Sequence, residues 1–268
     1  MSVSGLNPVA ATLYTPLYAR AHAAELVPEA GLRDPLAASL LDSAGPSAPG
    51  LLRDRNNVAG AIWRAVIFDE LTRQFSAEHP HGLVVSAGIG LCTRRQRLAG
   101  TVPDSLGWAG VDQPEVIALR REMLPEDDTV LMGGSLGKPG WAEDLRDAGR
   151  PVLVLAEGVI MYLTPEELAA FLTTARTVFG PGTQLVADYF HPMSMLSRRH
   201  PIARATGARF RSGARNGRAL AKLSPGWRLA GEYDVMERIS AVHRAAALIL
   251  RGVLFGGRPY AVAHLVGV

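Results

Sequence analysis

The stretch 83–95, which reads LVVSAGIGLCTRR, constrains the fold of this chain more than any other. A short apolar run reaches two glycines, Gly88 and Gly90, and then gives way to polar and cationic residues. This order predicts a buried strand that turns sharply at its carboxyl end, where backbone without side chains can approach a ligand. The third glycine of a dinucleotide fingerprint is replaced by Thr93. A nucleotide-type site and a plain tight turn between strand and helix are both compatible with this pattern.

An acidic residue follows at the distance expected for a nucleotide-binding sheet. Asp112 ends the apolar segment 108–111, about 20 residues after the glycine turn. In such a sheet, an acid at the tip of the second strand accepts hydrogen bonds from the two hydroxyls of a ribose. Asp112 also precedes Pro114 and Glu115, so it is suited to cap a helix. The two roles do not exclude each other.

Length and composition indicate a globular protein with a large core. The chain has 268 residues, of which 48% are hydrophobic and 20% charged, enough for one large domain or somewhat more. It has no apolar run of about 18 residues and no secretory signal pattern at its start, so we expect a cytoplasmic protein that does not enter a membrane. The single cysteine, Cys92, excludes an internal disulfide, and the scattered histidines predict no metal site.

Positive charge gathers in one part of the chain, although the net charge is only +3. The segment 193–229 contains no acid. This pattern is typical of a solvated face, or of a surface that attracts an anionic small-molecule substrate or an acidic acyl carrier protein. No motif for nucleic-acid binding accompanies the charge, so we expect no nucleic-acid partner. The cationic residues of the segment include Arg198, Arg199, Arg204, Arg209, Arg211, Arg215, Arg218 and Lys222.

From residue 83 onward, short apolar segments alternate with amphipathic ones. This alternation predicts an α/β fold with a parallel sheet and helices on both faces. Helices at 8–28, 36–41 and 58–79 precede the sheet, and the segment 245–255 is ambiguous. The expected strands are 83–87, 109–112, 129–133, 152–157 and 184–189, with helices at 115–123, 141–148 and 165–179, and with 227–235 and 260–266 forming an antiparallel edge.

The ends of four expected strands carry residues that can bind a ligand. They are the glycine turn, Asp112, the turn 133–136 and Glu157. In a parallel sheet these ends lie along one edge, so they converge on one crevice. Glycines for close approach, an acid for a diol and a third polar turn suit an adenosine. The absence of a Gly-x-x-x-x-Gly-Lys-Ser/Thr motif argues against a triphosphate.

Five segments in this order resemble the leucine carboxyl methyltransferase-like family, in particular its bacterial polyketide O-methyltransferase branch of the tetracenomycin type. The resemblance covers about residues 8–190. It implies a class I S-adenosylmethionine-dependent methyltransferase with a Rossmann-like, seven-stranded, mostly parallel sheet and a reversed last strand. The segments are Thr12-Leu13 with Pro16-Leu17-Tyr18-Ala19-Arg20-Ala21, Arg64 with Phe68-Asp69, VVSAGIGLCTR, VDQPEVIALRR and LAEGVIMYLTPEE.

The resemblance also implies a domain organisation. An N-terminal helical cap over residues 1–80 would cover the substrate. The cofactor-binding domain would follow over 81–268, with an insertion or lid at about 191–226.

Roles for individual residues follow from the same resemblance. Arg64 would hold the methionine carboxylate of S-adenosylmethionine, with Arg33 as a weaker candidate, and Glu157 would lie near the methionine amino group. Opposite charges support both assignments. Asp112 would bind the ribose. The backbone at Gly88 and Gly90 would approach the cofactor, and Ser135 and Leu136 would meet the adenine.

Two positions depart from the family pattern. The family usually has aspartate where this chain has Cys92, and often an acid where it has Ser135. The first change removes a carboxylate that would orient the glycine loop, and the second weakens adenine selection. They leave room for a methyltransferase-like cyclase or isomerase that transfers no methyl group, and for a binding or scaffold protein with a vestigial site.

The acceptor side is less well marked in the sequence. A carboxylate acceptor needs no base, whereas a phenol or enol benefits from one. His191, just past a strand tip, is the predicted base, with Asp188 to orient it, and Tyr162 would face the acceptor from its turn. The N-terminal helix would bring further substrate contacts over the pocket, namely Tyr14, Tyr18 and Arg20. The leading hypothesis is an O-methyltransferase acting on a carboxylate or hydroxyl of a small secondary metabolite.

Overall fold

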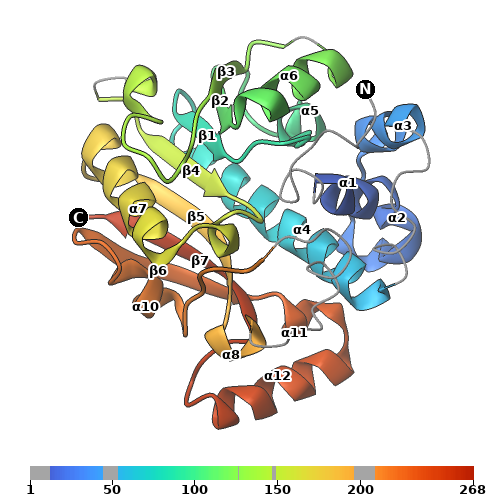
Figure 1. The fold of residues 1–268 in the computed structure, drawn as a ribbon. Coiled ribbons are helices and arrows are strands. Elements are labelled where there is room, and N and C mark those ends of the chain that lie inside the picture. Colours follow the sequence, from blue (N-terminus) through green and yellow to red (C-terminus); the bar gives the residue numbers. More distant parts are fainter. Residues whose placement is uncertain (1–12, 45–53, 126, 147–148, 196–208) are drawn as a thin grey trace.

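The structure of the protein, a computed structural model, describes residues 13–44, 54–125, 127–146, 149–195 and 209–268. A seven-stranded sheet in the order β3-β2-β1-β4-β5-β7-β6 runs through its centre (Figure 1). Only β7 is antiparallel to its neighbours. The predicted mostly parallel sheet with a reversed last strand is confirmed. Its strands are β1 Leu83–Ala87, β2 Gly107–Asp112, β3 Val130–Gly133, β4 Val152–Ala156, β5 Gln184–Phe190, β6 Trp227–Asp234 and β7 Tyr260–Gly267.

Both faces of the sheet are buried, as the apolar strands require. Every residue of β1 is buried, and successive side chains belong to different cores: Val85 to one cluster and Val84 to the other. Helices α7 (Pro165–Phe179) and α10 (Gly217–Ala221) cover the first face. Helix α4 (Arg55–Glu78) covers the second. This two-sided burial is typical of parallel sheets.

Helix α4 joins the N-terminal helices to the sheet. Its C-terminal half packs Phe68 and Leu71 on the sheet, whereas its N-terminal half packs Val58 and Ile62 against the first helices. Asp54 caps its start by accepting bonds from the amides of the second and third residues after it. The N-terminal helices are α1 Tyr14–Ala21, α2 Ala23–Leu26, η3 Pro28–Ala30 and α3 Pro35–Ala44.

The connections between strands are short helices. The predicted start of α7 is confirmed, because Thr164 and Glu167 form a reciprocal capping box. The helix predicted at 141–148 is wrong for the described residues, which form only the 3-10 turn η5 (Glu143–Leu145). There Trp141 and Leu145 insert into the core just after a left-handed glycine, so the chain does not continue as an amphipathic helix. The other elements are α5 Arg94–Leu98, α6 Pro114–Met123, η6 Ile160–Tyr162 and α8 Pro192–Met195.

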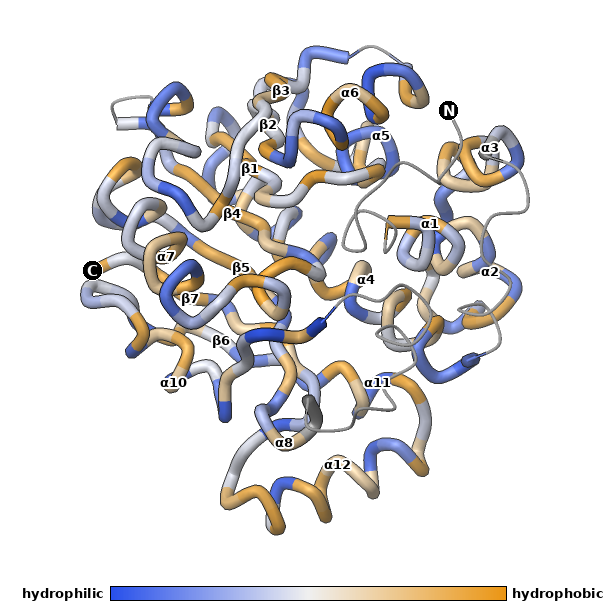
Figure 2. The backbone as a smooth tube through the Cα atoms, viewed as in Figure 1, coloured by the Kyte–Doolittle hydropathy of each residue, from blue (hydrophilic) through white to orange (hydrophobic). Residues whose placement is uncertain are grey.

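The C-terminal helices α11 (Met236–Ile239) and α12 (Ala241–Val253) lie beside the carboxyl ends of β5 and β6. The segment whose type was ambiguous in the sequence is therefore helical. Its inward stripe includes His243 and Ala247, whereas Val242 and Ile249 are exposed. Figure 2 shows hydrophobic and hydrophilic residues alternating along α12. In the described part of the chain, no helix combines the length and the apolar character needed to cross a membrane.

Candidate active site

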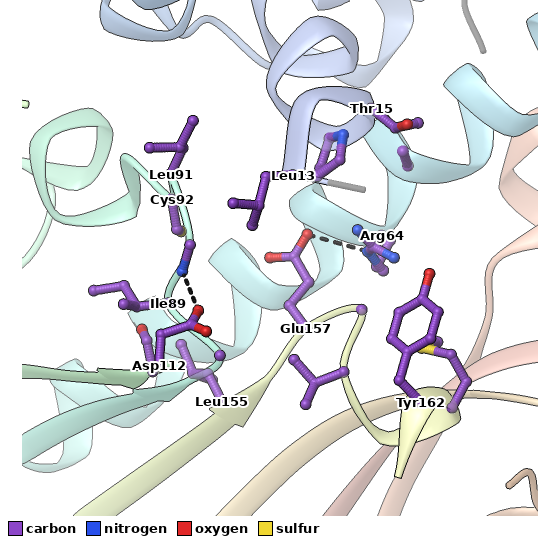
Figure 3. Close-up of a pocket in the computed structure, with 18 of the residues that line it drawn as sticks. Leu13, Thr15, Arg64, Ile89, Leu91, Cys92, Asp112, Leu155, Glu157 and Tyr162 are labelled. Carbon is purple, nitrogen blue, oxygen red and sulfur yellow. Dashed lines mark hydrogen bonds and ion pairs between the residues drawn. The ribbon is translucent and has the colours of Figure 1, made fainter. Parts of the chain in front are cut away.

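A cavity of about 600 Å³ lies at the carboxyl ends of β1, β2 and β4 (Figure 3). The strand order reverses here, because β1 has β2 on one side and β4 on the other, and ligands bind at such switch points. Helices α1 and α4 close the cavity from above. Its volume is within the range of roughly 300–1,000 Å³ that is typical of pockets for drug-sized ligands.

The glycine turn forms one wall of the cavity. Gly88 and Gly90 have φ angles of 76° and 47°, in the left-handed region that favours glycine. A Cβ atom on Gly88 would collide with the side chain of Val159, and one on Gly90 would collide with that of Leu13. The turn therefore requires glycine for both its conformation and its close packing.

Asp112 at the tip of β2 holds this turn in place. Its Oδ2 accepts a hydrogen bond from the Gly90 amide at 2.8 Å, and its Oδ1 accepts one from the Gln113 amide at 2.8 Å (Figure 3). Burial raises the pKa of its carboxyl group, and these two backbone donors partly oppose the shift. A carboxylate has about four acceptor sites, so Asp112 retains capacity for the hydroxyls of a ligand.

Arg64 and Glu157 form an ion pair at the cavity floor. Arg64 donates from Nε to Glu157 Oε1 at 3.1 Å and from Nη1 to Asp188 Oδ2 and Tyr260 Oη, each at 3.2 Å. Burial opposes the charge on the guanidinium, but Tyr260, Asp188 and Glu157 outweigh it and raise the pKa of Arg64. For Glu157, burial is outweighed by Arg94, Arg64 and Arg20, which hold its pKa well below the ordinary value.

A chain of buried ion pairs supports this floor from behind. Arg94 joins Glu157 Oε2 at 2.6 Å to Asp69 Oδ1 at 2.8 Å. Arg97 binds both oxygens of Asp69 and reaches Asp34 at 3.2 Å. Because each carboxylate has at least one arginine partner, the network can stay charged inside the protein. The sequence analysis missed these residues, although Arg94 directly follows the glycine turn and Asp69 stands in a quoted family segment.

Cys92 lies in the same wall and lines the cavity. Its Sγ is 3.6 Å from Nη1 of Arg94, and Arg120 binds its carbonyl oxygen at 2.7 Å. Burial favours the neutral thiol, but Arg94, Arg97 and Arg20 outweigh burial and lower the pKa of Cys92. The arginines thus surround the position where the family usually has an aspartate.

The remaining residues predicted for the cofactor lie around one end of the cavity. Ser135 and Leu136, in the turn after β3, both line it. The Gly134 amide donates to the Asp112 carbonyl oxygen at 2.8 Å, which fixes this turn beside β2. Arg33 is exposed and does not line the cavity.

Of the three N-terminal residues predicted for the substrate, the structure brings one to the cavity. Pro16 and Arg20 line it from one stripe of α1, and Leu13 lines it from the position just before that helix. Arg20 is buried and binds Asp34 at 3.0 Å and the Leu91 carbonyl oxygen at 2.7 Å. Tyr14 and Tyr18 point elsewhere: Tyr14 joins an apolar cluster with α3, and Tyr18 packs against His22 with ring centroids 4.3 Å apart and planes tilted by 44°. The spacing of the helix separates these stripes.

Of the two residues predicted for catalysis, only one lines the cavity. Tyr162, in η6, lines the cavity. His191 is buried outside the described lining, where its Nδ1 accepts from the Met193 amide at 3.2 Å. The preceding residue, Phe190, lines the cavity, and neighbouring residues of an extended chain point to opposite sides. Asp188 pairs with Arg64 and Tyr260 rather than with His191.

The far end of the cavity contains residues that the sequence analysis did not single out. Asn56 and Asn57 contribute from the start of α4. Phe190, Phe210 and Tyr260 contribute aromatic rings, and His243 contributes from α12. This end is called the acceptor half below, and the end formed by the glycine turn, Asp112, Ser135 and Leu136 is called the cofactor half.

The sheet order, the reversed β7 and a cavity at the strand tips define the class I methyltransferase fold. The structure resembles that of a proposed methyltransferase from Thermobifida fusca, with a TM-score of 0.61, 18% identity and coverage of 96% of this chain and 94% of that one. It also resembles a DUF574 family protein from Streptomyces avermitilis, with a TM-score of 0.55, 17% identity and coverage of 94% and 97%.

The chain belongs to the leucine carboxyl methyltransferase family, whose model matches residues 14–176. It is 32% identical over 177 residues to the tetracenomycin polyketide synthesis O-methyltransferase TcmP of Streptomyces glaucescens, covering 65% of this chain and 64% of that protein. A proposed S-adenosyl-L-methionine-dependent methyltransferase of Mycolicibacterium gilvum is 30% identical over 189 residues, covering 60% and 61%. The chain therefore spans less than two thirds of the length of these relatives, and the resemblance found in the sequence is confirmed.

Proposed function

We propose that this protein is an S-adenosylmethionine-dependent O-methyltransferase that acts on a carboxylate or hydroxyl of a small secondary metabolite such as a polyketide. The observation that carries the proposal is the convergence of the glycine turn, Asp112 and the Arg64–Glu157 pair on one cavity. The family match and the likeness to TcmP support the reaction class.

The cofactor half fits S-adenosylmethionine in shape and in charge. The glycine turn leaves room that a Cβ atom would fill. Asp112 would bind the ribose, and Ser135 and Leu136 would contact the adenine. Arg64 would bind the carboxylate of the methionine portion and Glu157 its ammonium group. When bound, the cofactor supplies a methyl group activated on a sulfonium.

The residues of the cavity would act mainly by positioning. A methyl transfer is an in-line displacement, so the rate depends on holding the acceptor oxygen in line with the methyl carbon and the sulfur, and on excluding water. Arg64 is suited to this task, because Glu157, Asp188 and Tyr260 fix its guanidinium from three directions. Apolar side chains such as Leu13, Ile89 and Val159 line the space around it and keep it dry.

The charge at the entrance of the cavity favours an acceptor that carries a negative group. Arg211 lines the cavity and has a side chain that is 54% exposed, so it can attract a negative group at the entrance. Its partner Glu167 is 3.7 Å away and half exposed, which makes their pairing weak. An acceptor delivered on an acyl carrier protein stays a prediction. That prediction rests on the cationic segment, and three of its arginines lie outside the described residues, namely Arg198, Arg199 and Arg204.

Calorimetric titration tests the cofactor assignment. S-adenosylmethionine and its demethylated product should both bind the intact protein. Asp112→Asn should weaken both affinities by about tenfold or more, because a charged acceptor for the ribose is lost. The matched control is Asp104→Asn, which changes an exposed carboxylate away from the cavity and should leave binding unchanged. Absence of binding to the unmodified protein would overturn the proposal.

A cyclase or isomerase that transfers no methyl group is the alternative. The replacement of family acids by Cys92 and Ser135, both of which line the cavity, favours this alternative. The two functions differ in the fate of a labelled methyl group. A methyltransferase moves the label to the product, whereas the alternative leaves the cofactor intact while the acceptor rearranges.

A further inference from the structure

The acceptor half of the cavity has a wall built from four aromatic rings. Tyr260 stacks on Phe190 with ring centroids 4.3 Å apart and planes 12° apart. Phe190 stacks on Phe210 at 5.2 Å, and Phe210 packs against Tyr162 at 5.7 Å. All four residues line the cavity, although they come from β7, β5, the segment before α10 and η6. Because Tyr260 and Phe210 stack on Phe190, the set offers mainly ring edges and the outer faces of its end members to a flat aromatic ligand.

His243 lines the same cavity from the first turn of α12. It lies on the inward stripe of the helix, four residues before the fully buried Ala247. Its Nδ1 is 2.8 Å from Ser240 Oγ, which also accepts the His243 amide at 3.3 Å as the helix cap. A serine hydroxyl has two acceptor sites, so it can accept both bonds. In that tautomer Nε2 carries the lone pair that a base requires.

Three other titratable groups around the cavity are poorly suited to take a proton. Burial raises the pKa of Tyr260 far above the ordinary value, so its hydroxyl stays protonated. Glu157 lies between two arginines and belongs to the floor. Glu167 is occupied as the capping-box acid of α7. Among the described residues that line the cavity, His243 is the only histidine.

We propose that His243 is the general base for a hydroxyl acceptor, and that this acceptor is a flat aromatic molecule held against the four rings. The inference rests on the proposed function, since it needs a methyl donor in the cofactor half. It distinguishes a phenolic acceptor from a carboxylate, which requires no base. Neither His243 nor Phe210 and Tyr260 lies within the residues matched by the family model.

The step is balanced without a further reactant. The phenolic oxygen attacks the methyl carbon, and the new O–C bond forms as the C–S bond breaks. The electron pair of that bond stays on sulfur and neutralises the sulfonium, which becomes a thioether. The phenolic proton passes to His243 Nε2, so the positive charge moves from sulfur to the imidazolium and is later released to solvent as a proton.

The test uses transfer of a radiolabelled methyl group from S-adenosylmethionine to three probes that share one framework of two fused six-membered rings. Naphthol is flat and carries a hydroxyl, naphthoic acid is flat and carries a carboxylate, and decalol carries a hydroxyl on a saturated, puckered ring system. We expect methylation of naphthol, and we expect decalol to bind at least roughly tenfold more weakly, because it cannot stack.

Substitutions at His243 and Phe210 separate the role of the base from that of the ring wall. His243→Gln should lower the rate with naphthol by about 100-fold or more, as expected for loss of a general base, and should leave the rate with naphthoic acid unchanged. Added imidazole should restore part of the naphthol rate in His243→Ala. The matched control is His22→Gln, which changes a histidine outside the described lining of the cavity.

For the ring wall, Phe210→Leu should weaken naphthol binding, whereas Phe179→Leu, outside the described lining of the cavity, should not.

The outcomes distinguish an error in the proposed function from an error in the present inference. If the cofactor fails to bind in the calorimetric titration, the proposed function itself is wrong. If the cofactor binds and naphthol is neither bound nor methylated, only the present inference is wrong. It is also overturned if His243→Gln reduces the rates with naphthol and naphthoic acid equally, because a merely structural role would have that effect.

Discussion

The two halves of the cavity are built in different ways. The cofactor half consists of turns that directly follow strands of the central sheet, and backbone hydrogen bonds and buried ion pairs fix it. The acceptor half combines the ends of β5 and β7 with η6, the segment before α10, α11 and α12, and its walls include four aromatic rings and one histidine. We infer that the donor would be bound by turns of the sheet architecture, whereas the choice of acceptor would depend more on the connections and helices around it.

The largest effect is expected from breaking the ion pairs that support the cofactor half. Arg94→Met removes a buried arginine that pairs with both Glu157 and Asp69. The free energy of unfolding should therefore fall by about 3–5 kcal/mol in urea titrations. Arg95→Met is the matched control. Its side chain is 25% exposed and pairs with carboxylates near the surface, so its cost should be at most about 1 kcal/mol. Equal losses for both variants would contradict the role given to the network.

A smaller effect is expected from the glycine turn. Gly88→Ala places a methyl group against Val159 in a left-handed conformation, at a cost of about 1–3 kcal/mol, and it should abolish cofactor binding. Gly100 also has a left-handed φ, 74°, but a Cβ atom added there by Gly100→Ala has no other atom within 4 Å. It should cost about 1 kcal/mol without changing cofactor affinity. Thermal unfolding and calorimetry measure the two quantities.

The cofactor half should also be the part that responds to acid. The pKa of Glu157 is lowered in the folded protein, so its ionisation stabilises the fold above its unfolded pKa of about 4.3, and this contribution is lost as the pH falls. The pKa of Asp69 is also lowered, so the stabilisation that its ionisation gives is likewise lost as the pH falls. The pKa of Asp188 is raised, so its protonation changes the stability in the opposite direction. In urea titrations at decreasing pH, Glu157→Gln should flatten the acid limb, and an unchanged limb would contradict this account.

The smallest effect on stability is expected in the acceptor half. Ser240→Ala removes the cap of α12 and the partner of His243 Nδ1, at a cost of about 1 kcal/mol. It should leave cofactor affinity unchanged and lower the rate of naphthol methylation. Asn216→Ala removes a comparable cap from α10, outside the described lining of the cavity, and should not lower that rate.

The sequence was sufficient to predict the cofactor half because its signals are local. The glycine turn, Asp112, Ser135 and Glu157 each stand at the end of an apolar run, so the order of strands alone brings them together. The ion pairs behind them join residues up to 63 positions apart, such as Arg94 and Glu157, and their pairing requires the packed structure.

The acceptor half could not be predicted in the same way. His191 was chosen because it follows a strand tip, but the alternation of the chain turns Phe190 rather than His191 toward the cavity. His243 lies in a helix that the sequence left ambiguous, and only the packing of α12 places it there. The division at residue 80 and the lid at about 191–226 stay predictions, and residues 196–208 of that lid lie outside the described chain.

A crystal structure with the demethylated cofactor product would test the central claim most directly. We expect the adenine beside Ser135 and Leu136, the ribose hydroxyls on Asp112 and the methionine portion against the ion-paired Arg64 and Glu157. The sulfur should then face the acceptor half, toward the four rings and His243. Product bound elsewhere, or bound here with its sulfur turned away from the rings, would contradict the account.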